Sequence, residues 1–308
     1  MKLSILLEEP ESLDFRPGTR RSGEAYDLWY NPHFMYAIAS LHDIKPLLLR
    51  VYKGEELVAL LPLYERKKLS LKALVCPVGA YYQGLHTFYP AGAAPNRMLL
   101  DTNAISEGLA LFLSKHYGRV HFKLTPRNAD VRAFTRNKYH STPMYTFTYP
   151  TSSTLHMLPD EKKKLRIAEK NGMQIEENFD PDTFMKLQQS LDNRKNRSLG
   201  TDLKDLGRFF ERLHNHGLLT QINVLQGSRV VSSNILYYDG GEIAYTVFMA
   251  SEAAAMQLGV STFHNVKLLS AMPEACRLLD YCGANVPEVA RFKAALGLNL
   301  QVFYHVSR

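Results

Sequence analysis

The chain has 308 residues, of which 45% are hydrophobic and 22% charged, and a formal net charge of +7. These proportions are typical of a globular protein, and the length suits two domains of about 150 residues each. The sequence contains no run of about eighteen apolar residues that could cross a membrane. Acidic residues follow the short apolar stretch in "MKLSILLEEPESLDF" at once, unlike a secretory signal. We therefore expect a cytoplasmic protein without a membrane span.

The cysteines and the net charge limit the chemistry further. Three cysteines in a chain of this length indicate reduced thiols, and Cys276 and Cys282 lie six residues apart without a histidine cluster. No metal site is therefore expected. The positive charge favours an anionic partner, such as a small-molecule, nucleotide-linked or lipid-linked substrate, RNA or a membrane surface. A solvated basic face fits the same number.

The first half of the chain alternates helices with antiparallel strands. Asn31 is placed to cap a helix over 31–42 that begins at Pro32. Apolar residues three and four apart predict another helix over 104–117. The other expected elements are a first strand at the N terminus, two strands joined by a turn at 53–55, a strand in "RVHFKLTP", a short helix near 128–138 and a strand over 143–150.

The second half has a similar order. A helix in "PDEKKKLRIAEKNG" ends at Asn171 and Gly172, and Asp180 is placed to cap a helix that begins at Pro181. Turns at 226–228 and 239–241 predict a meander of three strands. The other expected elements are the strand "MQIEEN", helices over 203–216 and about 260–279, a short strand at 278–281, a helix over 288–296 and a final strand.

The two halves repeat one architecture. Residues 119–149 and 278–306 occupy the same place in the order of elements, and the small polar stretch at 150–153 suits a linker. We therefore predict an α+β fold of two tandem domains, residues 1–150 and 151–308. Each domain is expected to contain a mixed, mostly antiparallel sheet flanked by helices.

Three stretches of the second half carry a resemblance to known families: "KKKLRIAEKNG", "YTVFMASEAAAMQLGVSTFHNVKLLSAM" and "LLDYCGANVPEVARFKAALG". Their order resembles the Gcn5-related N-acetyltransferase (GNAT) fold. Two such units in tandem resemble the FemABX-type aminoacyltransferases and the CelD/BioF2-like acetyltransferase domain family. The resemblance covers residues 160–306, and 20–150 by architecture only. It implies two tandem GNAT-like (acyl-CoA N-acyltransferase) domains, the first shaping the acceptor site and the second catalytic.

Lys293 is the first candidate catalytic residue. On the predicted helix 288–296, the residues Val289, Phe292 and Leu296 share one face, and Lys293 lies at its margin, where it can border a cleft without being buried. The resemblance implies that the pair Phe292–Lys293 lies beside the reaction centre. There the lysine would stabilise negative charge on a tetrahedral intermediate. A solvated lysine at a helix margin is the alternative.

Tyr245 is the second candidate catalytic residue. It lies on the strand before the central loop, where it can contact substrate or donate a proton, and an ordinary tyrosine pKa near 10 suits an acid. No motif distinguishes a base among Glu242, Asp280 and His264. No triad spacing or nucleophile elbow supports covalent hydrolase chemistry.

The stretch "MQLGVST", residues 256–262, resembles the loop that binds the pyrophosphate of coenzyme A through backbone N–H groups and a helix N-terminus in the GNAT fold. Gln257, Gly259, Ser261 and Thr262 are therefore candidate cofactor-binding residues. The spacing departs from the family pattern, and FemABX-type proteins lack this loop, which favours a different donor. A plain loop capped by Ser261 or Thr262 is the alternative.

Two basic clusters could bind a phosphorylated substrate or tRNA. They consist of Lys162, Lys163, Lys164, Arg166 and Lys170 on one helix, and of Arg194, Lys195 and Arg197. Arg166 and Lys170 lie four residues apart and share one helical face. We expect Lys163, Arg166, Lys170 and Arg194, with Phe292, to contact substrate. A solvated charged helix is the alternative.

The resemblance implies an N-acyltransferase that moves an acyl or aminoacyl group to a substrate amine by direct attack. It would use acyl-CoA or aminoacyl-tRNA as co-substrate, with no tightly bound cofactor, no metal and no covalent enzyme intermediate. The alternatives are a coenzyme A-dependent GNAT acetyltransferase acting on a small molecule and a non-catalytic binding module with a basic cleft. Free backbone amides near 257–261 would favour coenzyme A, and a basic channel along 162–170 would favour a FemABX-type enzyme. The sequence identifies neither donor, acceptor nor oligomeric state.

Overall fold

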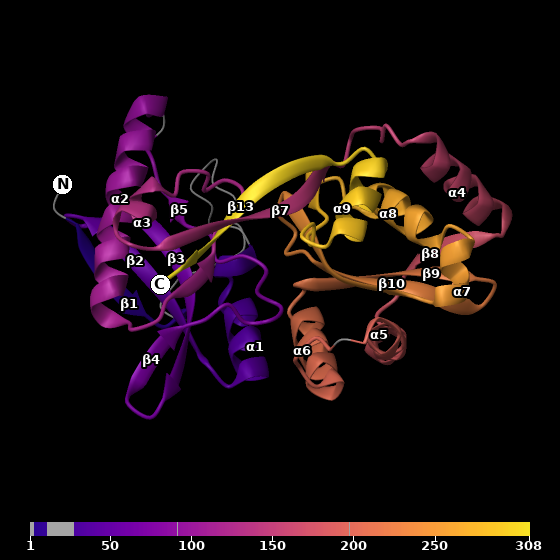
Figure 1. The fold of residues 1–308 in the computed structure, drawn as a ribbon, viewed down its shortest axis with the longest axis horizontal. Coiled ribbons are helices and arrows are strands. Elements are labelled where there is room, and N and C mark those ends of the chain that lie inside the picture. Colours follow the sequence, from indigo (N-terminus) through magenta and orange to yellow (C-terminus); the bar gives the residue numbers. More distant parts are fainter. Residues whose placement is uncertain (1–2, 11–27, 91, 197) are drawn as a thin grey trace. The chain divides into compact units, whose positions relative to one another are not determined.

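The structure, a computed structural model, describes residues 3–10, 28–90, 92–196 and 198–308. The chain forms two compact units (Figure 1). The first contains the N-terminal strand, Trp29–Met144 and Val302–Arg308, and the second contains Tyr145–Gln301. The last seven residues of the chain thus belong to the unit built mainly from its first half. Among the helices of the described residues, none is long and apolar enough to cross a membrane.

The first unit contains an antiparallel sheet with the strand order β1-β2-β3-β4, and β5 also pairs with β3. The central strand β3 is buried from Val58 to Glu65, so both faces of the sheet are covered. Its strands are β1 (Ser4–Glu8), β2 (Lys45–Lys53), β3 (Glu56–Lys68), β4 (Leu71–Leu74) and β5 (His86–Thr87). The other elements are the 3-10 helix η2 (Leu28–Tyr30), the helices α1 (Pro32–His42), α2 (Pro95–His116) and α3 (Arg132–Arg136), and the strand β6 (His121–Lys123).

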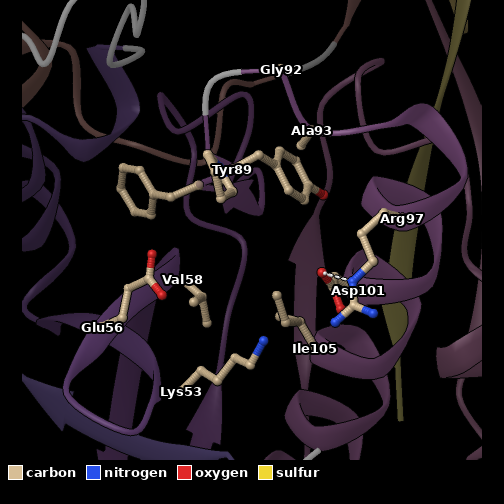
Figure 2. A pocket seen from close by; sticks show the side chains of 11 residues that line it. Lys53, Glu56, Val58, Tyr89, Gly92, Ala93, Arg97, Asp101 and Ile105 are labelled. Carbon is tan, nitrogen blue, oxygen red and sulfur yellow. Dashed lines mark hydrogen bonds and ion pairs between the residues drawn. The ribbon is translucent and has the colours of Figure 1, made fainter.

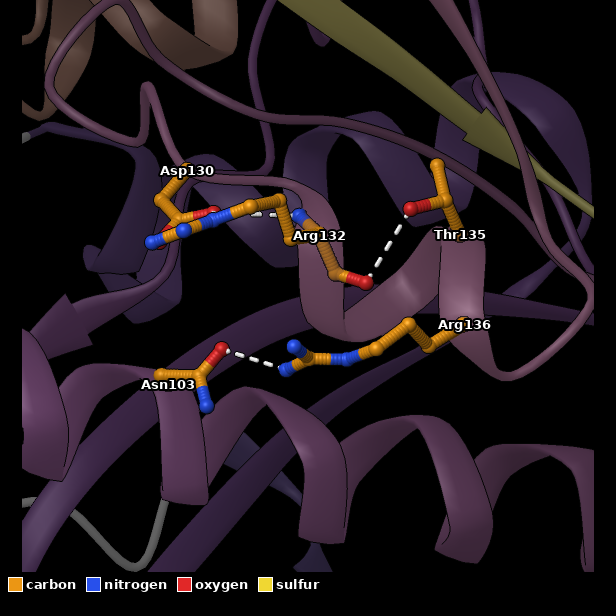
Figure 3. A network of polar contacts seen from close by, with 5 residues as sticks. All are labelled: Asn103, Asp130, Arg132, Thr135 and Arg136. Carbon is orange, nitrogen blue, oxygen red and sulfur yellow. Dashed lines mark hydrogen bonds and ion pairs between the residues drawn. The ribbon is translucent and has the colours of Figure 1, made fainter.

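Helices α2 and α3 lie side by side (Figure 3). Arg136 donates a hydrogen bond of 2.8 Å from Nη2 to Oδ1 of Asn103 on α2, and Arg132 forms an ion pair of 2.7 Å with Asp130. Below these exposed contacts, Leu109 and Leu113 of α2 pack with Phe122 and Phe134 in one apolar cluster. This cluster is the core of the first unit.

The second unit has the strand order β7-β12-β11-β10-β9-β8. All its neighbouring strands are antiparallel except β11 and β12. The strands are β7 (His140–Pro150), β8 (Met173–Glu177), β9 (Leu219–Gln226), β10 (Arg229–Tyr237), β11 (Ile243–Ser251) and β12 (Leu278–Asp280). Helices α5 (Pro181–Lys195) and α6 (Leu203–Asn215) cover one face of this sheet (Figure 1). The other face carries α4 (Pro159–Lys170), α7 (Ala253–Gln257), α8 (Val260–Ala271) and α9 (Pro287–Ala295).

The final strand β13 (Asn299–Ser307) returns the chain to the first unit. Its residues His305–Ser307 pair with β6, and Val306 joins the apolar cluster of that unit. Phe303 is fully buried, and its ring lies 5.1 Å from that of Tyr82. The C-terminal strand therefore supplies core residues to the first unit.

Most of the elements expected from the sequence are present, and several start or end elsewhere. Asn31 caps α1 by accepting from the backbone N–H of His33, and Asp180 caps α5 through Thr183, as expected. The helix expected over 260–279 ends at Ala271, because Pro273 forces Met272 into an extended conformation (ψ 139°). The helix expected from residue 104 begins earlier, at Pro95, with two exposed turns that carry no apolar periodicity.

Candidate active site

Helix α9 places Lys293 inside the second unit, which corrects the expectation of an exposed position at a helix margin. Lys293 is only 8% exposed, whereas Val289 is 36% exposed. The inward side of α9 includes Leu296 and half-buried Phe292, as expected, but it takes in Lys293 in place of Val289. A lysine can be buried in this way because its charged group finds hydrogen-bond acceptors.

The ammonium of Lys293 holds the turn that follows β12. Nζ donates to the carbonyl oxygens of Tyr281 at 2.6 Å and of Gly283 at 3.1 Å, and also to that of Cys282. A lysine ammonium has three N–H donors, and three carbonyls accept them here. Cys282 has a left-handed φ of 46°, which is unfavourable for a residue other than glycine, and these hydrogen bonds help to hold it.

A buried carboxylate supports the same turn. Asp280 accepts hydrogen bonds from the backbone N–H of Cys282 at 2.8 Å and from the hydroxyl of Thr146 at 2.5 Å. Burial lowers the pKa of Lys293 to about 8, an effect that the nearby Cys282 and Asp280 oppose. Burial, together with Asp280, raises the pKa of the Cys282 thiol well above its ordinary value. The second unit thus buries both a lysine and a carboxylate around one turn.

Tyr245 lies at the same point of the sheet. It is 3% exposed, and its register pairs it with Asp280 in the last pair of the short parallel ladder between β11 and β12. Beyond this pair β11 continues to Ser251, whereas the chain leaves the sheet after Asp280. Tyr245 therefore lies opposite Asp280 where the two central strands diverge, and Lys293 holds the turn that begins there. Phe292 packs half-buried against the adjacent apolar cluster.

The predicted cofactor loop forms the end of α7 and the start of α8, and helix α4 covers it. Gly259 has φ +81°, and a Cβ added there would lie 2.9 Å from the carbonyl carbon of Lys164 on α4. Thr262 donates a hydrogen bond of 2.5 Å to Oε2 of Glu161, a carboxylate that is 4% exposed. The helix N-terminus thus faces a buried acid. Gln257 is exposed, and Ser261 is half-buried.

The basic residues expected to contact substrate divide between two faces of the sheet. Lys163, Arg166 and Lys170 are exposed on α4, and no ion pair within the described part of the chain involves them. Arg194 is exposed in the last turn of α5, on the opposite face of the sheet (Figure 1). Arg197 lies outside the described residues. The structure therefore brings together the three cations on α4 and leaves Arg194 apart from them.

The alternative bases are engaged or neutral. His264 is fully buried, bonds to Ser232 at 2.7 Å through Nδ1, and has a pKa lowered by burial to about 3. Asp280 supports the turn after β12, and Glu242 lies 3.8 Å from Arg277. Asp280 and His264 are buried, and Glu242 is half-buried.

The first unit contains a cavity that the sequence analysis missed (Figure 2). It has a volume of about 400 Å³ and an apolar floor of Val58, Phe88 and Ile105. Charged residues surround it: Lys53, Glu56, Arg97 and Asp101, the last two joined by a hydrogen bond of 2.9 Å. Arg97 and Asp101 lie four residues apart, so they share one face of α2. The sequence did not indicate this pair, because the helix was predicted to begin only at residue 104.

Comparisons with known proteins show the fold. Neither a protein-family model nor a curated protein sequence matches the chain. Solved structures do: FemX is 13% identical with a TM-score of 0.61, over 88% of this chain and 90% of that one. The DUF2156 C-terminal domain of an Agrobacterium fabrum protein is 10% identical with a TM-score of 0.57, over 89% and 87%. L-PGS from Bacillus licheniformis is 11% identical with a TM-score of 0.52, over 88% and 86%. The expected α+β fold of two tandem GNAT-like units is confirmed, and it is the fold of FemX.

Proposed function

We propose that the protein is an acyltransferase that moves an acyl or aminoacyl group to a substrate amine, and that its donor is not coenzyme A bound at the α7–α8 turn. The fold shared with FemX and L-PGS supports the general class. The contact between α4 and α8 supports the proposal that coenzyme A does not bind at the α7–α8 turn. A pyrophosphate needs open backbone N–H groups at the positive end of a helix. Here the carboxylate of Glu161, which also pairs with Lys164 at 2.6 Å, accepts a hydrogen bond from Thr262 in the first turn, and the backbone of α4 lies against Gly259, so this end of α8 is covered.

We infer an aminoacyl-tRNA donor, held by the exposed basic side of α4. Lys163, Arg166 and Lys170 offer three cations without ion-pair partners among the described residues, and such groups neutralise backbone phosphates. In the reaction the amine nitrogen would form a bond to the ester carbonyl carbon. The ester C–O bond would then break, and the leaving hydroxyl would take the proton that the amine loses. Positioning and oxyanion stabilisation would supply most of the rate.

Lys293 and Tyr245 remain the proposed catalytic residues. In the free protein the three N–H donors of Lys293 are engaged by carbonyls. A direct contact with a tetrahedral intermediate would require one of these bonds to be exchanged for the oxyanion. Otherwise Lys293 acts as a positioning residue, through the turn that it holds.

Two ligands test the donor. Millimolar acetyl-CoA should not shift the melting temperature in thermal unfolding. A true ligand at a hundred times its Kd raises the free energy of unfolding by about 2.7 kcal/mol, which raises the melting temperature by a few degrees.

Unfractionated tRNA should bind in a mobility-shift assay, more weakly at 200 mM than at 50 mM salt. The triple variant Lys163→Gln/Arg166→Gln/Lys170→Gln should lose this binding, while Lys186→Gln/Arg194→Gln/Lys195→Gln on α5, with equal charge change, should keep it. A shift with acetyl-CoA, or no binding of tRNA, would contradict the proposed donor.

One observation favours a second candidate, a non-catalytic binding module: the donors of Lys293 are all occupied by the protein itself. An assay with a mixture of tRNAs charged with labelled amino acids distinguishes a transferase from a binding module. A transferase should shorten the lifetime of the aminoacyl ester when a pool of small amines is added. A binding module should lengthen that lifetime or leave it unchanged.

A further inference from the structure

The hairpin of β3 and β4 carries two large apolar side chains at its tip. Leu69 is 89% exposed and Leu71 is 75% exposed, more than any other large hydrophobic residue in the described parts of the chain. The hairpin projects from the first unit (Figure 1), and its two-residue turn consists of Leu69 and Ser70. Neither leucine contributes to a core of the unit, so folding does not explain them.

Cations surround this apolar tip. Arg66, Lys67, Lys68 and Lys72 are all exposed, and the stretch 66–72 contains no acid. The register places Lys67 directly opposite Lys72, a pair of like charges that opposes strand pairing. Arg119 extends the basic surface, since its backbone pairs with Ala73 of β4. Glu65, the acid next to this stretch in the sequence, is buried and accepts from the hydroxyl of Tyr117 at 2.9 Å, and Lys72 lies 3.6 Å from it.

The backbone conformation at the tip of the hairpin is also unfavourable for a leucine. Leu69 has φ +55°, in the left-handed region. Two-residue hairpin turns place Asn, Asp or Gly in such positions, because a larger side chain raises the energy of this conformation. Leu69 thus has an unfavourable backbone conformation, is exposed, and lies among positive charges. The stability of the folded protein does not explain a leucine at this position.

We propose that this hairpin docks the protein on an anionic lipid surface. The apolar tip would enter the boundary between headgroups and acyl chains, and the cations behind it would contact the phosphates. The spacing suits this arrangement: at about 3.3 Å per residue, Lys68, Lys67 and Arg66 lie within roughly 10 Å of Leu69. Leucines at the tip favour a lipid over a nucleic acid, which would use cations and aromatic rings. This proposal does not depend on the proposed enzymatic function.

Vesicle sedimentation of the full chain tests the proposal. Vesicles of phosphatidylcholine and phosphatidylglycerol in equal parts should bind the protein at 50 mM salt, and 500 mM salt should release it. Vesicles of phosphatidylcholine alone should bind much less. Each cation near an anionic surface contributes about fivefold to the partition coefficient, so the variant Arg66→Gln/Lys67→Gln/Lys68→Gln should bind about a hundredfold more weakly.

The leucine variants separate insertion from charge. Leu69→Asn suits the left-handed turn, and Leu71→Thr keeps strand propensity, so the pair should preserve the melting temperature while it lowers binding at least tenfold. The control Lys186→Gln/Lys195→Gln/Lys204→Gln removes three exposed charges elsewhere and should bind as the wild type does. The proposal is overturned if phosphatidylglycerol vesicles fail to bind, or if the leucine variant binds them as the wild type does. It is also overturned if the hairpin charges are needed for tRNA binding and not for vesicle binding.

Discussion

Lys293 shows how far a single residue can be interpreted from sequence. The resemblance of "RFKAALG" to the FemABX-type motif predicts a functional lysine, and the structure places it beside the diverging central strands. Its burial and its three carbonyl acceptors could not be predicted, because the acceptors lie ten to twelve residues earlier in a turn with left-handed backbone. Apolar spacing placed Val289 inward because it contains no information about such partners.

The pKa of Lys293 gives a prediction at this scale. Burial lowers it from 10.5 to about 8, so between these pH values the unfolded chain binds more protons than the folded protein does. The free energy of unfolding of the wild type should therefore rise from pH 8 to 10.5 relative to that of Lys293→Met, and the difference should be constant below pH 7. Urea unfolding of both proteins across this range measures it. A constant difference throughout would mean that Asp280 and the carbonyls keep the pKa near its ordinary value.

At the scale of elements, the pattern of residues predicted most helices and strands but not their contacts. Caps and turns act locally, so Asn31, Asp180 and Pro273 decide where helices begin or end. The packing of α4 on α8 is different. Gly259 looks like a loop glycine in the sequence, whereas in the fold it allows the backbone of Lys164 to approach. On the function proposed above, that contact, and not the loop motif, would decide what the N-terminus of α8 binds.

A glycine pair tests the α4–α8 contact. Gly259→Ala should lower the free energy of unfolding by about 3 kcal/mol or more, because left-handed φ costs an L residue about 1–2 kcal/mol and the new Cβ also overlaps α4. Gly227→Ala is the matched control, since Gly227 has φ +64° and nothing within 4 Å of an added Cβ. It should cost only the backbone contribution. Equal losses in denaturant unfolding would show that α4 does not press on α8.

At the scale of the whole molecule, the compact units differ from the predicted division at residue 150: residues 145–150 belong to the second unit, and the last seven residues belong to the first. Val302–Arg308 ends the chain yet belongs with Trp29–Met144. Its backbone pairs with Val120 through two hydrogen bonds of 2.9 Å, and Phe303 and Val306 are fully buried. An N-terminal half alone would lack these core residues.

Expression of separate halves tests this division. Residues 1–150 alone should be unfolded or aggregated, because burial of two large apolar side chains contributes several kcal/mol, a large part of a typical domain's stability. Deleting 302–308 from the full chain should lower the melting temperature of the first unit in calorimetry. Truncation after Ser307 is the control: it removes the two hydrogen bonds between Arg308 and Val120 but leaves Phe303 and Val306 in place, so it should lower the melting temperature much less. A folded, cooperative fragment 1–150 would instead support the boundary predicted from the sequence.

The sequence by itself determined the local features: the order of helices and strands, the caps, the duplicated architecture and the resemblance that the fold comparison confirmed. These depend on residues close together in the chain. Only the tertiary structure decided the cavity beside Arg97, the burial of Lys293 under three carbonyls, the acid against α8 and the return of β13 to the first unit. The burial of Lys293 joins a helix to a turn ten to twelve residues earlier, and the others join segments far apart in sequence. Their energies come from packing and hydrogen bonds that no local pattern contains.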